Sequence, residues 1–324
     1  MNTRAAAVVF GVLLTLFAHV CKADNAVWPT KTVTLVVATQ AGGGADRLAR
    51  TLADYLAKKW GQSVVVENRP GATTIVGSNF VAKSPPDGYT LLFTLVGLVQ
   101  SPALRKSIPY DVEKDFAPIT QLVNSEILFL AQADAPYRSL QGFIAAARSA
   151  SSPLNYGTGG IGHTYHIYGA QLAKAAGIEL NPIPYRGEHD AITGLLGGQI
   201  QAVFGSIGTA TPLIQDKKLQ ALGVVSKRRW KGLPDVPTFA EQGVPIKELS
   251  TWFGMLAPAG TPVAIVNKVA EDVREALHQP RMARLVESQG MDVIANSPAD
   301  FAERIHIDLK LWKQLVQELG ISPQ

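Results

Sequence analysis

Short apolar runs alternate along the first hundred residues with longer segments in which apolar residues recur every third or fourth position. Residues 32–39 form a β-branched run typical of a buried strand, whereas residues 45–60 place Leu48, Leu52 and Leu56 on one helical face. The same reasoning predicts further strands at 63–67 and 89–95 and a helix at 75–83. This β-α-β-α-β order predicts a mainly parallel sheet covered by helices.

The same alternation recurs in the second half of the chain. We predict strands at 127–131, 200–204 and 219–225 and a further strand that ends at 155–156. We predict helices after a cap at Ser139, at 164–176, and after Gly187. Thr261–Pro262 and Ser297–Pro298 each place a capping hydroxyl before a proline, which predicts two more helices near the C-terminus.

These patterns predict an α/β fold with two lobes and a mainly parallel sheet in each lobe. We expect residues 24–124 and 250–324 to form the first lobe, and residues 125–249 to form the second. A proline- and glycine-rich stretch at 233–260 is expected to return the chain from the second lobe to the first.

The N-terminus has the pattern of a secretory signal peptide at 1–23. A basic start at Arg4 precedes the apolar run 5–20, and Cys21-Lys22-Ala23 supplies small residues for cleavage after Ala23. The run is shorter than the roughly 20 residues that a spanning helix needs, which disfavours a membrane anchor. A lipoprotein anchored through Cys21 is disfavoured because the preceding Val20 is bulky. Cleavage would remove the only cysteine, and a protein without disulfides suits a bacterial periplasm.

The charge pattern argues against nucleic-acid binding. The chain has 47% hydrophobic and 17% charged residues and a formal net charge of +4, a composition typical of a packed globular protein. Its basic run Lys227-Arg228-Arg229 is only three residues long, and a nucleic-acid partner usually requires a basic face. We therefore expect no nucleic-acid partner.

Two segments share the order strand, glycines, helix. The first is VVATQAGGGAD, residues 36–46, and the second is LNYGTGGIGHTYH, residues 154–166. Glycines let the backbone turn sharply and leave the first amides of a helix uncovered. Those amides and the helix dipole favour a small anion. One such loop is often only a tight turn. Two such loops in separate lobes predict a cleft in which one anion is bound from both sides.

The second segment also contains a literal G-x-G-x-x-G at Gly157, Gly159 and Gly162. A dinucleotide site needs an acidic residue that ends the following strand, about 20 residues further on. Glu179 precedes the apolar run 183–185 instead of ending it. We therefore disfavour a dinucleotide site and expect no cofactor.

A metal site and a catalytic site are also disfavoured. His163 and His166 could share a helix face and His189 could join them, but no carboxylate or cysteine is in register. Ser206, a histidine and Asp190 supply the residue types of a catalytic triad, but any chain of this size offers such residues. The chain has no G-x-S-x-G elbow and no P-loop. We expect no enzyme activity. The alternative is a secreted α/β enzyme that acts on a small anionic substrate in the same cleft.

Several longer segments resemble the Bug family, the periplasmic solute receptors of tripartite tricarboxylate transporters. Their order and spacing agree with the family almost from end to end. The matching segments are WPTKTVTLVV, GGGADRLARTLADYL, VVVENRPGA, SPPDGYTLL, PYRGEHDAITGLLGGQI, LPDVPTFAEQG and TWFGMLAPAGTP. The resemblance implies a type II periplasmic-binding-protein (Venus-flytrap) fold that closes on a small carboxylate through a hinge near residues 124 and 250.

The resemblance also implies which residues surround the ligand. In the family, backbone amides of two glycine loops hold the carboxylate, and a loop after the third strand faces the cleft. The candidate ligand-binding residues in this chain are Gly42, Gly43, Gly44, Ala45, Asp46, Thr94, Thr158, Gly159, Gly162, His163, Thr164, Gly205 and Ser206. The implied partners are the small carboxylate and a two-subunit membrane transporter, and we expect a monomer that serves uptake or sensing.

Three departures from the family bear on the ligand. Residues 38–41 read Ala-Thr-Gln-Ala where the family commonly has Pro-Phe-Pro-Pro, so one aromatic wall is missing. Gly205 follows Phe204 where many members have an aspartate that can meet a ligand's ammonium group. We therefore expect no preference for an α-amino acid. His163 replaces a small residue, and it either donates to a ligand or caps the helix.

Overall fold

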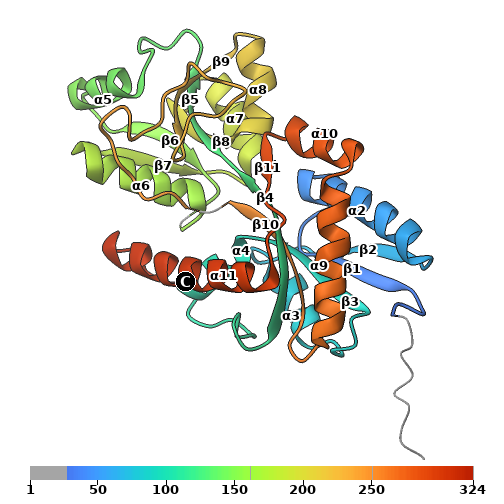
Figure 1. Cartoon of the computed structure of the whole chain (residues 1–324). Helices are drawn as coiled ribbons and strands as arrows, with labels where there is room; N and C mark the ends of the chain where they lie inside the picture. The colour runs from blue at the N-terminus through green and yellow to red at the C-terminus, as the bar shows by residue number, and fades with distance from the viewer. Residues whose placement is uncertain (1–27, 161, 250, 324) are drawn as a thin grey trace, which may run out of the picture.

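The computed structural model describes residues 28–160, 162–249 and 251–323, which form two α/β lobes (Figure 1). The predicted signal peptide at 1–23 lies outside the described residues. Within the described ranges, no helix is both long and apolar enough to span a membrane. The α/β class and the two-lobed architecture predicted from the sequence are confirmed.

The first lobe contains a six-stranded sheet with the strand order β11-β4-β10-β3-β1-β2. Its strands are β1 (Val33–Val37), β2 (Val64–Asn68), β3 (Thr90–Leu95), β4 (Phe116–Ser125), β10 (Trp252–Pro258) and β11 (Met291–Val293). Its helices are α2 (Gly44–Trp60), α3 (Ile75–Ala82), α4 (Gly97–Leu104), α9 (Val263–Leu277), α10 (Pro280–Ser288) and α11 (Pro298–Glu318). Leu35 packs into the core shared with α2 and α9, while its neighbour Val36 packs into the core shared with α4 and α11. Both faces of β1 are therefore covered, which explains its continuous apolar run.

The second lobe contains a five-stranded sheet with the order β7-β6-β8-β5-β9. Its strands are β5 (Ile127–Gln132), β6 (Leu154–Thr158), β7 (Leu180–Pro184), β8 (Ala202–Ser206) and β9 (Leu219–Val225). Its helices are α5 (Leu140–Ser149), α6 (Thr164–Ala176), α7 (Glu188–Leu196) and α8 (Ile207–Gln215). Alternate residues of β5 face opposite cores: Phe129 packs with Phe143 of α5, and Leu130 packs with Ile192 of α7.

Both sheets are mixed rather than mainly parallel. β1 pairs in parallel with β2 and β3, and β6 pairs in parallel with β7 and β8, as the alternating helices predict. β10 runs antiparallel to β3 and β4, and β5 runs antiparallel to β8 and β9. β11 also runs antiparallel to β4. Of the strands with reversed direction, β5 and β10 are those by which the chain enters or re-enters a lobe, and antiparallel neighbours need no crossover helix.

The chain crosses between the lobes twice. Glu126 alone separates β4 from β5, and the segment between β9 and β10 brings the chain back. The sequence analysis assigned the whole stretch 233–260 to this return, but residues 252–258 form β10, which lies between β3 and β4. Every residue of β10 is buried. Gly254 obscured the strand pattern, and the structure shows that it leaves room for the ring of Phe301.

Two of the three predicted hydroxyl caps are confirmed. The Ser139 side chain accepts a hydrogen bond from the Gly142 backbone N–H at the start of α5, and Ser297 forms a capping box with Asp300 at the start of α11. The third prediction is wrong. Pro262 occupies the cap position of α9, and the Thr261 hydroxyl instead donates to the Pro258 carbonyl oxygen at 2.8 Å.

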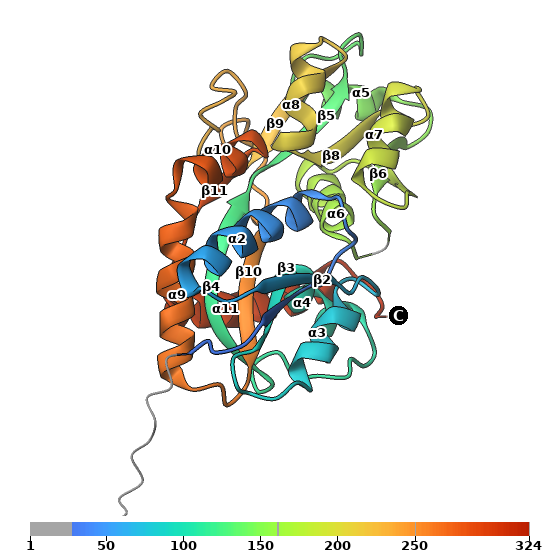
Figure 2. The same ribbon diagram turned by 90° about the vertical axis from the view of Figure 1, so that its right-hand side faces the viewer.

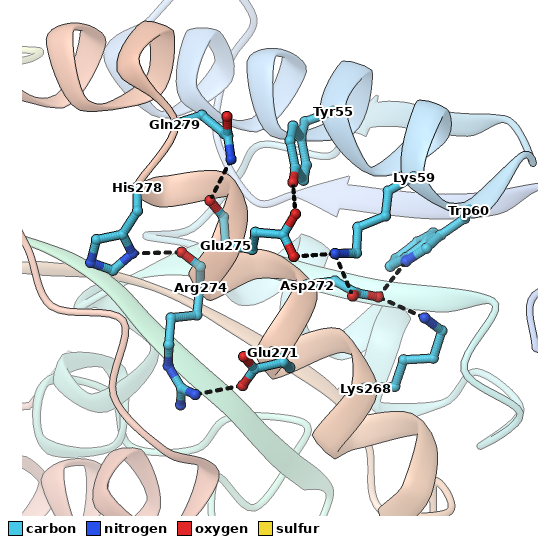
Figure 3. Close-up of polar contacts among 10 residues, drawn as sticks. All are labelled: Tyr55, Lys59, Trp60, Lys268, Glu271, Asp272, Arg274, Glu275, His278 and Gln279. Carbon is cyan, nitrogen blue, oxygen red and sulfur yellow. Dashed lines mark hydrogen bonds and ion pairs between the residues drawn. The ribbon is translucent and has the colours of Figure 1, made fainter.

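A polar network fastens α2 to α9 on the outer side of the first lobe (Figure 3). Asp272 accepts from Trp60 Nε1 at 2.6 Å and from Lys268 Nζ at 2.9 Å, and it lies 3.3 Å from Lys59 Nζ. Glu275 accepts from Tyr55 and from Lys59. Because these contacts involve the C-terminal half of α2, they hold the direction in which the N-terminus of the helix points.

Candidate functional site

The first glycine loop connects β1 to α2. Gly42 has a φ of +86°, a left-handed conformation that favours glycine, and Gly43 is the N-cap of α2 with extended backbone. No side chain caps this end of the helix. Gly42 and Gly43 are exposed, Gly44 is half-buried and Ala45 is buried. The loop therefore presents uncapped backbone amides at the positive end of a 17-residue helix.

Asp46 fixes the shape of this loop. Its Oδ2 accepts from the Gly42 backbone N–H at 2.9 Å and from Arg50 Nε at 3.0 Å, and its Oδ1 accepts from Asn68 Nδ2 at 2.9 Å. Burial raises the pKa of this carboxyl, but the hydrogen bonds from Arg50, Gly42 and Asn68 outweigh burial and lower it overall. The structure thus turns the Asp46 carboxylate toward its own loop, where it positions the glycines.

The second glycine loop connects β6 to α6. The Thr158 hydroxyl accepts from the Gly160 backbone N–H at 3.1 Å, and the Gly162 backbone N–H donates to His166 Nδ1 at 3.0 Å. Gly162 has a φ of +79°, and a side chain there would collide with Leu104 of the first lobe. The loop is therefore built against the opposite lobe and not only against its own helix.

His163 is the N-cap residue of α6. Its Nδ1 accepts from the Tyr165 backbone N–H at 3.4 Å, and its ring covers Gly159, where an added Cβ would lie 2.8 Å from the ring. Protein surrounds the ring although part of its surface stays exposed, and the resulting desolvation, with the neighbouring His166, lowers its pKa to about 4. His163 is thus neutral near pH 7, with Nδ1 as acceptor and Nε2–H as donor. The structure shows the capping role, and donation to a ligand through Nε2 stays a prediction.

Two contacts bring α4 of the first lobe onto the second glycine loop. Gln100 Nε2 donates to the Thr164 hydroxyl at 2.7 Å in a buried position, and Leu104 packs against Gly162. The predicted ligand residue Thr164 is 4% exposed, and its hydroxyl already accepts a hydrogen bond between the lobes. Thr164 therefore joins the lobes in this structure.

The start of α8 holds an internal carboxylate that the sequence analysis missed. Glu188 Oε1 accepts from the Ser206 backbone N–H at 2.6 Å and from the Ser206 hydroxyl at 2.8 Å. A Cβ at Gly205 would lie 3.3 Å from the same oxygen. No spacing in the sequence indicates this contact, because the helix α7 and the strand β8 lie between the two residues that form it.

Gln289 is a second residue that the sequence analysis missed. It follows α10, and its carboxamide packs against Gly44 at the start of α2 while its backbone packs against Gly208 at the start of α8. The residue is 9% exposed, and within the described part of the chain its Nε2 has no hydrogen-bond partner. Gln289 thus connects helix starts from both lobes, and a glutamine at a helix end carries no signal of this in the sequence.

The remaining candidate, Thr94, is separated from the loops. It is completely buried in β3, and its hydroxyl has no hydrogen-bond partner among the described residues. The structure therefore brings together residues 42–46 around Asp46 in one lobe. Residues 158–160, 162–164 and Ser206 lie at the edge of the other sheet, while Thr94 is buried.

Two hollows on the surface lie away from these loops. One, of about 550 Å³, is lined at the starts of β6 and β7 by residues such as Asn155 and Asn181. The other, of about 360 Å³, lies between α6 and the end of α11, beside Lys174 and Glu318. Neither contains a residue of the glycine loops. We place the candidate site at the loops because uncapped amides, not hollow volume, recognise anions.

Two α/β lobes joined by two crossings, with helix starts from both lobes at their boundary, define the class of two-lobed periplasmic solute-binding proteins (Figure 2). The sequence profile described as the tripartite tricarboxylate transporter family receptor matches residues 48–321. The chain belongs to this family, whose members are periplasmic binding proteins. The resemblance drawn from the sequence motifs is confirmed.

Similar proteins cover nearly the whole chain. A protein encoded in the tcbD-tcbE intergenic region of Pseudomonas sp. strain P51 is 32% identical over 296 residues, which cover 91% of this chain and 88% of the relative. The R. palustris protein Rpa4515, solved with adipate, has a TM-score of 0.82 and 30% identity, with 92% of this chain and 100% of that chain covered. MatC from Rhodopseudomonas palustris, solved with bound malate, has a TM-score of 0.77 and 30% identity, with 89% and 100% covered.

Proposed function

We propose that this protein is an exported receptor that binds a small organic carboxylate between its two lobes. The observation that carries the proposal is the start of α2, where the N-cap residue Gly43 supplies no side-chain cap for the first helical amides and Asp46 holds the loop in shape through the Gly42 N–H. The start of α6 supplies the opposing side, with the neutral His163 as an additional donor. Similar proteins solved with adipate and malate support a carboxylate as the ligand class.

The remaining parts of the proposal follow from family membership. The receptor is exported by a signal peptide cleaved after about Ala23, acts in the periplasm as a monomer, and delivers its ligand to a two-subunit membrane transporter or to a sensor. Neither a nucleic acid nor a cofactor takes part. The lobes comprise residues 24–124 with 250–324, and residues 125–249. Closure occurs about the crossings near residues 124 and 250, and ligand contacts shift the population toward the closed state.

The test replaces Gly43, the N-cap of α2. A Cβ at this position would meet no atom closer than 3.9 Å, and aspartate is a preferred N-cap residue, so Gly43→Asp is expected to fold at least as well as the natural chain. The new carboxylate would occupy the amides and repel a ligand carboxylate. Calorimetric titration of residues 24–324 with adipate, malate and 5-hydroxypentanoate should therefore show at least about a tenfold weaker affinity in Gly43→Asp.

Gly43→Asn is the matched control, because it has the same shape and capping ability without the charge. It should bind carboxylates more tightly than Gly43→Asp. Equal affinities in the two variants would place the ligand away from α2 and contradict the proposed site. Absence of binding to every carboxylate by the natural chain would contradict the proposed function. Recovery of a chemically altered ligand would favour the secreted enzyme instead.

A further inference from the structure

Three helix starts lie along one edge of the sheet in the second lobe. β6, β7 and β8 run in parallel, so their carboxyl ends meet at the same edge, and each leads into a helix, α6, α7 or α8. Helix starts at such an edge attract anions. They are not equivalent in this chain, because one of them is already occupied by an acidic side chain of the protein.

The occupied start is that of α8. Glu188 is the first residue of α7, and its Oε1 accepts both the backbone N–H and the hydroxyl of Ser206, the N-cap of α8. The Ser206 hydroxyl also lies 3.0 Å from the Thr209 hydroxyl. The carboxylate thus stands where a bound anion would otherwise stand.

The same carboxylate is connected to the start of α6. Tyr165 is the second residue of α6, and burial and the nearby Glu188 carboxylate raise the pKa of its phenol well above its usual range. The Tyr165 ring packs edge-on against His163 with ring centroids 5.0 Å apart. The Tyr165 side chain therefore neighbours both His163 at the start of α6 and the Glu188 carboxylate.

The charge of Glu188 is not neutralised within the described parts of the chain. No ion pair joins it to a lysine or arginine among residues 28–160, 162–249 and 251–323. The imidazoles of His163 and His166 have pKa values lowered by burial and do not supply a cation near neutral pH. Arg186, two residues before Glu188, is exposed to solvent. A second carboxylate on a ligand would therefore face an uncompensated like charge.

We propose that Glu188 is a specificity-determining residue that selects carboxylate ligands by their far end. It disfavours a second carboxylate at the distal end of the ligand. It favours a hydroxyl or an ammonium group at that end, because its second oxygen can accept a hydrogen bond from either group. The proposal rests on the proposed function and narrows its substrate class to short monocarboxylates with a distal donor. The expectation of no preference for an α-amino acid, drawn from the missing aspartate at Gly205, stays a prediction, because the donor that Glu188 favours lies at the distal end of the ligand.

The experiment compares probes of equal length. Pentanoate, 5-hydroxypentanoate, 5-aminopentanoate and glutarate are titrated calorimetrically into residues 24–324, together with their four- and six-carbon analogues. The natural chain should bind the hydroxy or amino acid at least about tenfold more tightly than the dicarboxylate, because like charges in a site reject the wrong ligand. Glu188→Gln should reduce this ratio by about tenfold or more.

Asp190→Asn is the control, because Asp190 is exposed two residues further along α7 and the substitution changes the net charge by the same amount. It should leave the ratio unchanged. Glu188→Asp withdraws the carboxylate by one methylene, so the preferred ligand should become one carbon longer even if Glu188→Gln folds poorly. A natural chain that prefers the dicarboxylate, or a ratio that Glu188→Gln does not change, would overturn the proposal. Failure to bind any carboxylate would overturn the proposed function on which it rests.

Discussion

Substitution of Asp46 by asparagine tests whether the first glycine loop is held in shape by a single carboxylate. The two oxygens of Asp46 accept three hydrogen bonds, and the side chain is 5% exposed. Asparagine has the same shape but offers only one acceptor oxygen. Whichever way its amide turns, an NH₂ group faces Asn68 on one side or Gly42 and Arg50 on the other, so at least one hydrogen bond is lost.

The expected cost follows from these contacts. A hydrogen bond to a charged group contributes about 1.5–3 kcal/mol, and the share of Arg50 is discounted because its side chain is 51% exposed. We expect Asp46→Asn to lower the free energy of unfolding by about 2–3 kcal/mol, which at about 2–4 °C per kcal/mol is a fall in Tm of about 4–12 °C. Carboxylate affinity should fall by about tenfold as the Gly42–Gly44 loop loses its order.

Thermal unfolding and calorimetric titration at pH 7 provide the measurements. Asp54→Asn is the control, because Asp54 is exposed on the same helix. The bonds to Asp46 lower its pKa, so its contribution to stability is present above the usual value of 3.8 and is lost as pH falls through the lowered value. The difference between Asp46→Asn and the natural chain should therefore disappear in strong acid. An Asp46→Asn protein with unchanged Tm and unchanged affinity would refute this reasoning.

Three further predictions concern the second loop, the boundary between the lobes and the outer network. Carboxylate affinity should change by less than about twofold between pH 8 and pH 6, because His163 with a pKa of about 4 stays neutral throughout; a steep rise toward pH 6 would show a cationic role instead. A double-mutant cycle of Gln100→Leu and Thr164→Val, measured by urea unfolding, should give a coupling of about 1 kcal/mol, whereas additive effects would contradict the buried hydrogen bond. Asp272→Ala should lower the free energy of unfolding by about 2–3 kcal/mol, while Glu271→Ala, at a side chain 68% exposed, should change it by less than about 0.5 kcal/mol.

The sequence predicted the elements that have their own local signal. The helix 164–176 and the strand 219–225 coincide with α6 and β9, because an amphipathic stripe and a β-branched run act over adjacent residues. β10 was not predicted, because its residues read as an apolar segment among prolines and glycines and only its neighbours β3 and β4 make it a strand. Local strand propensity does not decide the structure where a strand forms by pairing with strands more than a hundred residues away in the sequence.

The features of the candidate site also fall into those that the sequence predicts and those that it does not. The glycine loops could be found from the sequence, because glycines followed by a helical stripe are a local pattern. The roles of Asp46, Thr164 and Gln289 could not, because each depends on a contact with a distant residue. Asp46 was predicted to contact a ligand, but its oxygens turn toward Gly42, Arg50 and Asn68.

Glu126, the single residue between β4 and β5, predicts how stability varies with pH. Desolvation, together with the carboxylates of Glu248 and Asp292, raises its pKa from 4.5 to about 7 against the opposing effect of Arg228. Between pH 4.5 and 7 the folded state therefore binds more protons at this position than the unfolded state. Stability should fall as pH rises through this window.

Glu126→Gln tests this argument, because glutamine keeps the shape of the protonated acid and cannot ionise. A shift from 4.5 to about 7 corresponds to at most about 3.4 kcal/mol, which we discount to about 1–2 kcal/mol because the group keeps partial contact with water. Thermal unfolding should show equal Tm values for Glu126→Gln and the natural chain near pH 4.5 and a higher Tm for the variant at pH 8. Glu113→Gln, at a side chain 53% exposed, is the control. Glu126 lies where the chain passes from one lobe to the other. If the Tm difference between Glu126→Gln and the natural chain is the same at pH 4.5 and at pH 8, ionisation of Glu126 does not destabilise this crossing and the argument is refuted.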